Sequence, residues 1–229
     1  MDDPIDKTTV EACGPAFSED RLIAARAKTW HALHAIAELI KPGMHETQAL
    51  RLANKTLAAM GAKRLWHPTQ MRFGANTVKP FGVPSDGDPV LQENDIYFVD
   101  IGPLWDGYEG DAAKTFVVGE DSELRRCASD AEAIYAEVRR KWLMEASTGQ
   151  ALYRYAEQAA QARGWHLNLH EANGHRLANF PHHLHFSGAI ADVAFRPATA
   201  RWVLEIQIRH SSSLYGAFFE DLLLDADPT

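Results

Sequence analysis

Residues 99–111, which read VDIGPLWDGYEGD, contain the clearest structural signal in this chain of 229 residues. Asp106 and Gly107 stand between apolar residues. A two-residue turn of type I′ needs positive φ at both central positions, which Asp and Gly adopt readily. The pair therefore predicts a β-hairpin in which Trp105 pairs with Tyr108, provided that no one-residue bulge shifts the register.

Counting outward from this turn predicts which hairpin residues face each other. Gly102 lies opposite Asp111, and Asp100 lies on the same sheet face as Gly102, two residues along the strand. Asp100 and Asp111 are then diagonal neighbours with backbones about 7–8 Å apart. Two carboxylates on a half-buried face are costly unless a cation neutralises them. The hairpin therefore predicts a metal site, with a solvated acidic hairpin as the alternative.

The rest of the chain predicts helices and strands in two similar blocks. Apolar residues at helical spacing predict helices over 19–40, 47–60, 122–147 and 148–164. Strands are expected over 63–66, 70–73, 96–101, 166–170, 202–209 and 213–224. Because the strands are grouped, we expect an α+β fold in which helices cover one side of an antiparallel sheet. We expect one domain over 1–229, with 1–18 as a flexible or extended N-terminal segment.

Composition excludes several classes of protein. The chain has 23 Lys and Arg against 31 Asp and Glu, a net charge of −8, with 46% hydrophobic and 24% charged residues. These values are ordinary for a globular protein, and the missing basic stripe argues against nucleic-acid binding. The sequence has no apolar run long enough for a membrane helix and no apolar signal core near Met1, so we expect a cytoplasmic protein. Cys13 and Cys127 are expected to be free thiols.

The second block of the chain carries further candidate ligands. His175 and His182 lie seven residues apart in an apolar, loop-like stretch, while Glu205 and Glu220 are embedded in strongly apolar strands. Ionised carboxylates are rarely buried without partners. Together with Asp100 and Asp111, the two glutamates and one imidazole form an oxygen-rich set that suits two Mn²⁺, Fe²⁺ or Co²⁺ ions, with zinc as a further option.

The run from His182 to His185 leaves open which imidazole faces such a site. A small shift of the loop would give the role of His182 to His183 or His185. Alternation along an extended strand would place His183 and His185 on one side and His182 on the other.

The order Asp100, Asp111, His175, Glu205 and Glu220 resembles the five metal ligands of the pita-bread metallopeptidases, peptidase family M24. This family includes methionine aminopeptidase, aminopeptidase P, prolidase and creatinase-like proteins. The surrounding segments VDIGPLWDGYEGDAAKTFVVG, GH, LEIQI and FFEDLLL are similar as well. The resemblance extends over most of residues 20–225. It implies a pita-bread fold, a curved antiparallel sheet covered by helices in two pseudo-symmetric halves.

The resemblance also implies a mechanism. Asp100 would chelate one metal ion, Asp111 and Glu220 would bridge two, and His175 with Glu205 would complete the second. A hydroxide held between the ions would attack the carbonyl carbon, and the amide or peptide C–N bond of a small amino-acid-like or peptide substrate would break. Glu205 would shuttle the proton.

The same resemblance assigns partners to this centre. His182 would donate a hydrogen bond to the substrate carbonyl as negative charge develops there. Because homodimers are common in the family, the resemblance also leads us to expect that this chain forms a homodimer.

The sequence departs from the family pattern at Phe81, where relatives have a histidine that contacts the scissile amide. Phenylalanine can neither donate nor accept a proton, so Phe81 is expected to line the substrate site without that role. His67, in the sequence Trp66-His67-Pro68, is a candidate to approach the site from a neighbouring strand. Two alternatives remain: a metal-dependent non-peptidase, either a lyase or an iron enzyme, and a non-catalytic binding homologue.

Overall fold

The structure is a computed structural model that describes residues 6–170, 172–212 and 214–225, without the side chain of His183. The α-helices are α1 (Lys7–Val10), α2 (Glu19–Leu39), α3 (Glu46–Ala59), α4 (Ser122–Glu145) and α5 (Gly149–Ala162). The strands are β1 (Leu65–Phe73), β2 (Asp95–Trp105), β3 (Tyr108–Glu109), β4 (Ala112–Val118), β5 (His166–Leu167), β6 (His175–Arg176), β7 (Trp202–Arg209) and β8 (Gly216–Leu222). Short 3₁₀ helices are η1 (Gly74–Val78), η2 (His182–Leu184) and η3 (Ile190–Asp192).

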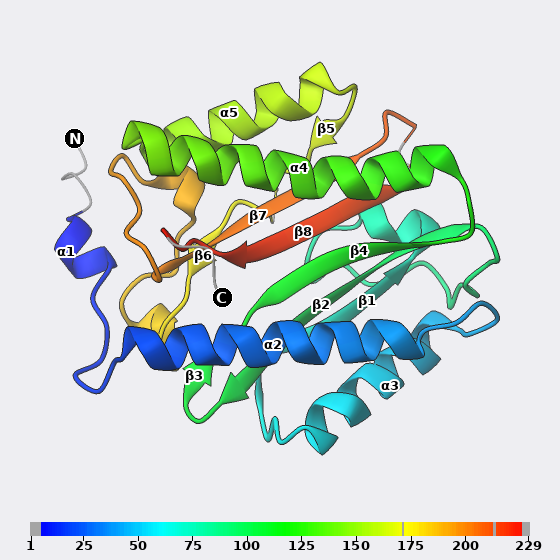
Figure 1. Cartoon of the computed structure of the whole chain (residues 1–229), viewed down its shortest axis with the longest axis horizontal. Coiled ribbons are helices and arrows are strands. Elements are labelled where there is room, and N and C mark those ends of the chain that lie inside the picture. The colour runs from blue at the N-terminus through cyan, green and yellow to red at the C-terminus, as the bar shows by residue number, and fades with distance from the viewer. Residues whose placement is uncertain (1–5, 171, 213, 226–229) are drawn as a thin grey trace.

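The strands form one antiparallel sheet in the order β1-β2-β4-β8-β7-β5, with β3 paired to β2 and β6 paired to β7. Helix α2 packs on β2 and β4, and α3 packs on β1 (Figure 1). Helix α4 packs on β7 and β8, with α5 beside it. The expected grouping is confirmed: two similar halves, each a helix pair on neighbouring strands, join where β4 meets β8.

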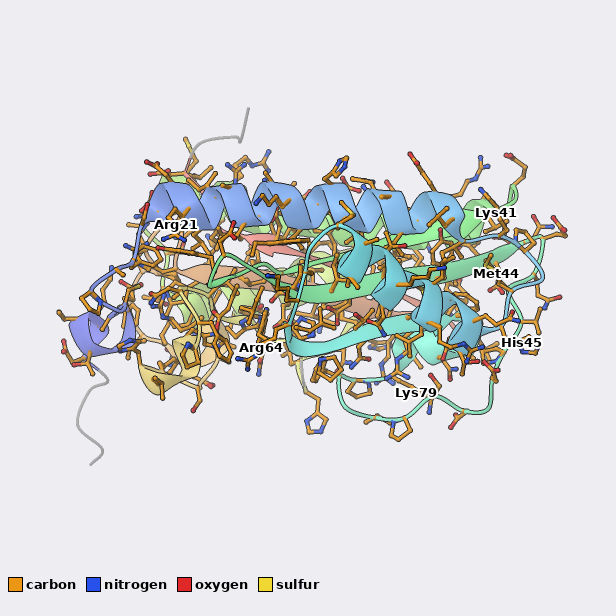
Figure 2. The ribbon with its side chains drawn as sticks, turned by 90° about the horizontal axis from the view of Figure 1, so that it is seen from below. Arg21, Lys41, Met44, His45, Arg64 and Lys79 are labelled. Carbon is orange, nitrogen blue, oxygen red and sulfur yellow. The ribbon has the colours of Figure 1, made fainter. Side chains whose placement is uncertain are left out.

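The helices cover one face of this sheet, and the other face carries the candidate site. Figure 2 shows α2 on one side of the strands and the loop with Lys79 on the opposite side. Along β7, the residues Trp202, Leu204 and Ile206 belong to a hydrophobic cluster that includes α4 residues. Glu205 alternates with them and therefore points away from the helices.

The helix boundaries follow local capping chemistry. Ser18, Asp121 and Thr148 are the N-caps of α2, α4 and α5, and the side-chain oxygen of each accepts backbone N–H groups of the first turn. Gly61 and Gly164 have φ of 96° and 81°, the left-handed conformation that stops a helix. The predicted helices are confirmed, with ends within about two residues of the observed ones.

The strands differ from prediction in three places. The pieces expected at 63–66 and 70–73 form the single strand β1, whose register shifts around Pro68, a residue with no N–H for the ladder. Strand β5 is shorter than the expected 166–170, because the Asn168 side chain accepts from the His170 backbone and turns the chain. Strand β8 is likewise shorter than the expected 213–224, and residue 213 lies outside the described residues.

Each half has its own hydrophobic cluster. One cluster combines α2 and α3 residues such as Leu33 and Leu57 with sheet residues such as Phe73. The second combines α4 and α5 with β7 and β8 and includes Trp142 and Trp202. The clusters follow the two halves for the most part, but Val203 and Leu222 of the second half belong to the first cluster and Ile96 of the first half belongs to the second.

The N-terminal segment, expected over 1–18 to be flexible or extended, contains the short helix α1 and contacts the second half. The Glu11 carboxylate accepts a hydrogen bond from the Trp202 indole at 2.8 Å, and the Arg176 guanidinium donates to the Ala12 carbonyl. Residues 1–5 lie outside the described part. Among the described helices, none combines the length and apolar character needed to cross a membrane. Cys13 and Cys127 are free thiols.

Candidate metal centre

The hairpin at residues 99–111 forms as the sequence predicts. Asp106 and Gly107 have φ of 52° and 84°, as a type I′ turn requires, and Trp105 pairs with Tyr108. The same offset continues to the pair of residues 101 and 112, so the register is unbroken on both sides of the metal-site candidates. The two aspartates of the hairpin therefore lie on one face of the sheet.

Three carboxylates line up across the strands that join the two halves. Asp100 on β2 pairs with Ala113 on β4, Ala113 pairs with Glu220 on β8, and Glu220 pairs with Glu205 on β7. Residues that pair directly in an antiparallel sheet point to the same face. We call Asp100, Glu220 and Glu205 the carboxylate row; the small side chain of Ala113 leaves the space between them open.

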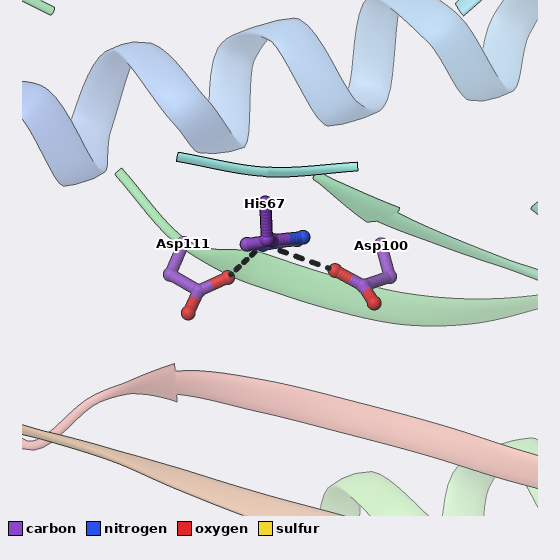
Figure 3. Close-up of side chains that lie close together, drawn as sticks. All are labelled: His67, Asp100 and Asp111. Carbon is purple, nitrogen blue, oxygen red and sulfur yellow. Dashed lines mark hydrogen bonds and ion pairs between the residues drawn. The ribbon is translucent and has the colours of Figure 1, made fainter. Parts of the chain in front are cut away.

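Asp111 stands beside this row, between two imidazoles. The His67 Nε2 atom lies 3.2 Å from Asp111 Oδ1 and 3.7 Å from Asp100 Oδ1 (Figure 3). The His175 Nε2 atom lies 2.9 Å from Asp111 Oδ2. The structure thus brings together all five residues of the predicted ligand set and adds His67 to them.

Buried oxygens in this cluster lack ordinary partners. Asp100, Asp111, Glu205 and Glu220 are all buried. Asp100 Oδ1 and Glu220 Oε1 have no hydrogen-bond partner within the described residues. A buried polar atom without a partner is costly, and a buried carboxylate more so. The donor set of carboxylate oxygens and imidazole nitrogens therefore fits divalent cations.

The carboxylates cannot all remain ionised without compensating positive charge. Burial raises the pKa of Asp100 to about 7. Burial, together with the charges of Asp111, Asp100 and Glu205, raises the pKa of Glu220 well above its usual range. Burial also raises the pKa of Glu205. For Asp111, burial acts in the same direction, but His175 and His67 outweigh it and hold the pKa below its usual range. In the metal-free protein, bound protons therefore supply the positive charge that metal cations would supply in the loaded site.

The two histidines respond to the same charges. Burial alone would lower the pKa of His67, but Asp100 and Asp111 raise it to about 9. For His175, burial is again outweighed, mainly by the hydrogen bond and charge of Asp111, and the pKa rises to about 10. The carboxylates therefore stabilise the protonated, positively charged form of both imidazoles in the metal-free cluster.

The hydrogen bonds of the two Nδ1 atoms define the orientation of these rings. The Nδ1 of His67 lies 2.9 Å from the Pro68 carbonyl, and the Nδ1 of His175 lies 2.7 Å from the Arg176 carbonyl. A carbonyl oxygen only accepts, so each Nδ1 carries a proton and each Nε2 faces the carboxylates. This arrangement is typical of metal-ligating histidines, whose second nitrogen donates to an outer partner.

His182 lies beside this cluster in a buried position. Its ring stacks against His175 with centroids 5.8 Å apart, and its Nδ1 lies 2.8 Å from Glu109 Oε2. Burial lowers the pKa of His182, opposed by Glu109. Residues 182–184 form a 3₁₀ turn, so the alternation expected for an extended strand is wrong here. Of the other two candidates, His185 is only partly buried and the side chain of His183 lies outside the described structure.

Phe81 stands at the entrance to the site. Its side chain is 42% exposed, and its ring lies edge-on to His67 at 5.6 Å. It lines a small cavity of about 20 Å³ that reaches Asp100 and Glu205, and also a larger one of about 410 Å³ near Arg72. Gln70 lines both cavities as well. The Phe81 ring therefore separates the carboxylate cluster from the larger cavity.

Two residues of the site were not predicted from the sequence. Glu109 is fully buried and accepts from the His182 backbone N–H as well as its ring. Strand alternation places Glu109 on the same side as Asp111, so its position in the site could have been predicted from the hairpin. Trp66 lies within 5.3 Å of the His67, His175 and His182 rings. The position of Trp66 could not be predicted, because the register of β1 shifts between Leu65 and His67.

The fold and the oxygen-rich cluster together define a metallopeptidase-type domain. The model of metallopeptidase family M24 matches residues 20–224, and the chain belongs to this family. The predicted family and pita-bread fold are thereby confirmed.

Proteins of known activity share this sequence pattern over part of their length. The chain is 30% identical to methionine aminopeptidase of Aquifex aeolicus over 101 residues, which is 39% of each protein. It is 26% identical to methionine aminopeptidase of Escherichia coli K12 over 179 residues, 72% of this chain and 66% of that protein. The chain thus spans less than two thirds of the length of these relatives.

Solved structures show the same fold at low sequence identity. The prolidase from Pyrococcus furiosus superposes with a TM-score of 0.72 and 21% identity, covering 90% of this chain and 60% of that one. An X-Pro aminopeptidase from Thermotoga maritima gives a TM-score of 0.71 at 20% identity, covering 91% and 61%. A methionine aminopeptidase from Thermotoga maritima gives 0.67 at 18% identity, covering 96% and 94%.

Proposed function

We propose that this protein is a dinuclear metal-dependent hydrolase that cleaves a C–N bond, amide or peptide, in a small peptide-like substrate. The observation that carries the proposal is the carboxylate row, in which Asp100, Glu220 and Glu205 come into register from both halves of the sheet. Asp111 lies beside that row and contacts His175 at 2.9 Å. Membership of the M24 family supports the hydrolase class.

The ligand assignment follows from where each residue lies. Asp100 would hold one ion, Asp111 and Glu220 would be shared, and His175 with Glu205 would hold the second. Oxygen and imidazole donors favour manganese, iron or cobalt, and also accept zinc. When bound, two such ions would lower the pKa of water so that hydroxide is available near neutral pH, and they would polarise a carbonyl group.

The chain's own residues supply proton transfer and substrate contact. Glu205 Oε2 accepts from the Gly174 backbone N–H at 2.6 Å, which fixes the carboxylate while its other oxygen remains for a proton. His182 contacts the substrate amide through Nε2, because Glu109 holds its Nδ1 proton. With its single proton on Nδ1, the neutral ring presents Nε2 as an acceptor for the amide N–H of the substrate. Donation to the carbonyl oxygen as negative charge develops there needs the doubly protonated ring, which burial disfavours and the Glu109 carboxylate favours.

A substrate panel tests the proposal. The protein, loaded separately with Mn²⁺, Fe²⁺ (under anaerobic conditions) and Co²⁺, is incubated with dipeptides, peptides with N-terminal Met, and Xaa-Pro peptides. We expect metal-dependent release of an amino acid, lost in Glu205→Gln and retained in Asp106→Asn, a change at the exposed turn of the same hairpin. Bound metal without turnover of any peptide would contradict the peptidase assignment.

Phe81 favours a second candidate function, a metal-dependent lyase or iron enzyme acting on a small non-peptide substrate. The ring occupies the rim where the relatives have a histidine, and it cannot exchange a proton. Phe81→His is the companion test. A rise in peptide turnover would show that the rest of the site handles peptides, and no rise would favour the non-peptide reaction. A protein that turns over neither class would be a non-catalytic binding homologue.

A further inference from the structure

We propose that His67 is a sixth protein ligand of the centre, bound through Nε2 to the ion held by Asp100. This inference rests on the proposed metal centre and adds to it a residue outside the five-ligand pattern. Each ion would then have one imidazole: His67 on the Asp100 side and His175 on the Glu205 side.

The first observation is the spacing of the ligand atoms. One atom each from His67, Asp100 and Asp111 lie within 4.8 Å of one another. The His67 Nε2 atom is 3.2 Å from Asp111 Oδ1 and 3.7 Å from Asp100 Oδ1. With metal–ligand bonds of about 2.1 Å, neighbouring ligands lie about 3.0 Å apart in an octahedral site and about 3.4 Å apart in a tetrahedral one. The three atoms are thus close to the spacing needed to share one ion.

The second observation is an orphaned carboxylate oxygen at the same position. Asp100 Oδ1 is buried and has no hydrogen-bond partner in the described residues, and the His67 ring is the nearby cationic group. A cation placed between Asp100 and His67 would give this oxygen a partner. The orphaned oxygen therefore indicates a ligand at this point and not only an acidic surface.

The third observation is the match between the two histidines. Each donates Nδ1–H to the carbonyl of the next residue, and the two Nε2 atoms approach opposite oxygens of the Asp111 carboxylate. His67 therefore repeats the orientation of His175, which belongs to the predicted ligand set. A histidine placed only to contact substrate would not need this outer hydrogen bond and this approach to Asp111 together.

The local backbone is built to admit the His67 ring. A Cβ at Gly102 would lie 2.1 Å from Cδ2 and 2.2 Å from Nε2 of His67, so any side chain at this position would displace the ring. The shift of register at Pro68 brings His67 opposite Gly102. Trp66 and Phe81 then contact the ring edge-on at 4.4 Å and 5.6 Å between centroids. The ring is held in place on three sides.

Titration of the chelator-treated full chain with Co²⁺ tests the proposal, followed by calorimetry and by the visible absorption of bound Co²⁺. We expect two sites in the wild type. In His67→Ala, one site should weaken by at least about 100-fold, the upper end of the loss when an outer partner of a ligand is removed. The absorption of that site should change, and added imidazole should restore it. Gly102→Ala should produce the same loss by displacing the ring.

His182→Ala is the matched control, because this histidine contacts Trp66 as His67 does but lies outside the group of atoms that shares the ion. We expect both Co²⁺ affinities to remain as in the wild type. Circular dichroism of the metal-free variants checks that each one folds, and His67→Gln supplies a second test if the alanine variant does not. Two unchanged Co²⁺ sites in His67→Ala or His67→Gln would overturn the assignment of His67 as a ligand but not the proposed dinuclear centre. A wild type that binds no Co²⁺ would overturn the proposed dinuclear centre itself.

Discussion

The two halves of the sheet contribute to the candidate site in different ways. The first half supplies Asp100 and Asp111 from one hairpin, eleven residues apart, through a register that begins at a type I′ turn. The second half supplies His175 from a two-residue strand and His182 from a 3₁₀ turn, both inside a long irregular stretch. Regular pairing places the two aspartates, and it also places Glu205, Glu220 and His175 in the second half. Buried hydrogen bonds to Glu109 and Glu205 instead hold the loop that carries Gly174 and His182.

The difference shows which bonds hold each part of the site. In the first half, backbone ladders fix the aspartates whether or not the site is loaded. In the second half, the loop depends on carboxylates: Glu109 accepts from residues 178 and 182, and Glu205 accepts from Gly174. Changes to these carboxylates should therefore disturb the loop over residues 174–182 more than the paired strands, apart from their effect on metal binding.

The largest effect should come from Asp111, the residue that joins the two halves. Asp111→Asn removes one negative charge from the position between His67 and His175, so we expect metal binding and activity to be lost together. Elemental mass spectrometry and the peptide assay measure both. Asp106→Asn, in the turn of the same hairpin, is the control. Full metal occupancy in Asp111→Asn would show that this carboxylate does not unite the two sides.

Glu220 and Asp221 are neighbours on β8 that point to opposite faces. We expect Glu220 to serve metal binding and Asp221 to serve the stability of the fold. Glu220→Gln should abolish metal binding but keep the fold, because burial raises the pKa of Glu220 and glutamine mimics the neutral acid. Asp221 accepts hydrogen bonds from Arg26 Nε at 2.6 Å and Trp30 Nε1 at 2.9 Å, which connect α2 to β8.

Asp221→Asn should give the reverse result. It should keep the metal but lower the free energy of unfolding by roughly 3 kcal/mol, since it breaks a buried ion pair. Metal analysis and denaturant unfolding measure the two effects. Equal loss of metal in both variants would contradict the assignment of metal binding to Glu220 and of stability to Asp221.

A moderate effect is expected at Glu109, which supports the second half. Glu109→Gln keeps the size of the side chain but removes the charge that holds the His182 Nδ1 proton. We expect activity to fall by about 10–100-fold, as when outer partners of functional histidines are removed, while two equivalents of metal remain. Steady-state kinetics and metal analysis on one preparation check this. Wild-type kinetics would mean that His182 needs no such support.

The smallest effect concerns the pH dependence of the metal-free protein. His67 and His175 have pKa values raised to about 9 and about 10, against 6.5 for the unfolded chain. Between these limits the folded state binds more protons than the unfolded state, so stability is full below pH 6.5 and falls as pH rises toward 9–10. Asp100, with a pKa raised to about 7, adds a loss between about pH 4 and 7.

We therefore expect the Tm of chelator-treated protein to fall by several degrees between pH 6 and pH 9. With metal bound, the cluster carries fewer protons, and the decline should shrink or reverse. Thermal unfolding with and without chelator measures both curves. A Tm independent of pH without metal would contradict the proton-filled cluster.

Much of the first half could be predicted from the sequence. The turn at Asp106 and Gly107 gives the register, and the register alone places the two aspartates on one face. Helix positions followed from the spacing of apolar residues. These features depend on local rules that a sequence displays directly.

The remainder depends on contacts that no local rule specifies. His67 reaches the site because β1 changes register at Pro68 and because Gly102 leaves room, two facts on different strands. His182 is placed by a 3₁₀ turn and by Glu109, 73 residues away in the chain. The pairing of Glu205 with Glu220 likewise arises from the way β7 and β8 meet, which alternation within either strand does not reveal.

The central claim, a dinuclear centre shared by both halves, is tested most directly by the metal content of the full chain purified without chelators. Elemental mass spectrometry should give two equivalents of manganese, iron or cobalt per chain. The Asp111→Asn variant, prepared in parallel, should give none. A wild-type protein that holds no metal and takes up none on incubation with these ions would contradict the account.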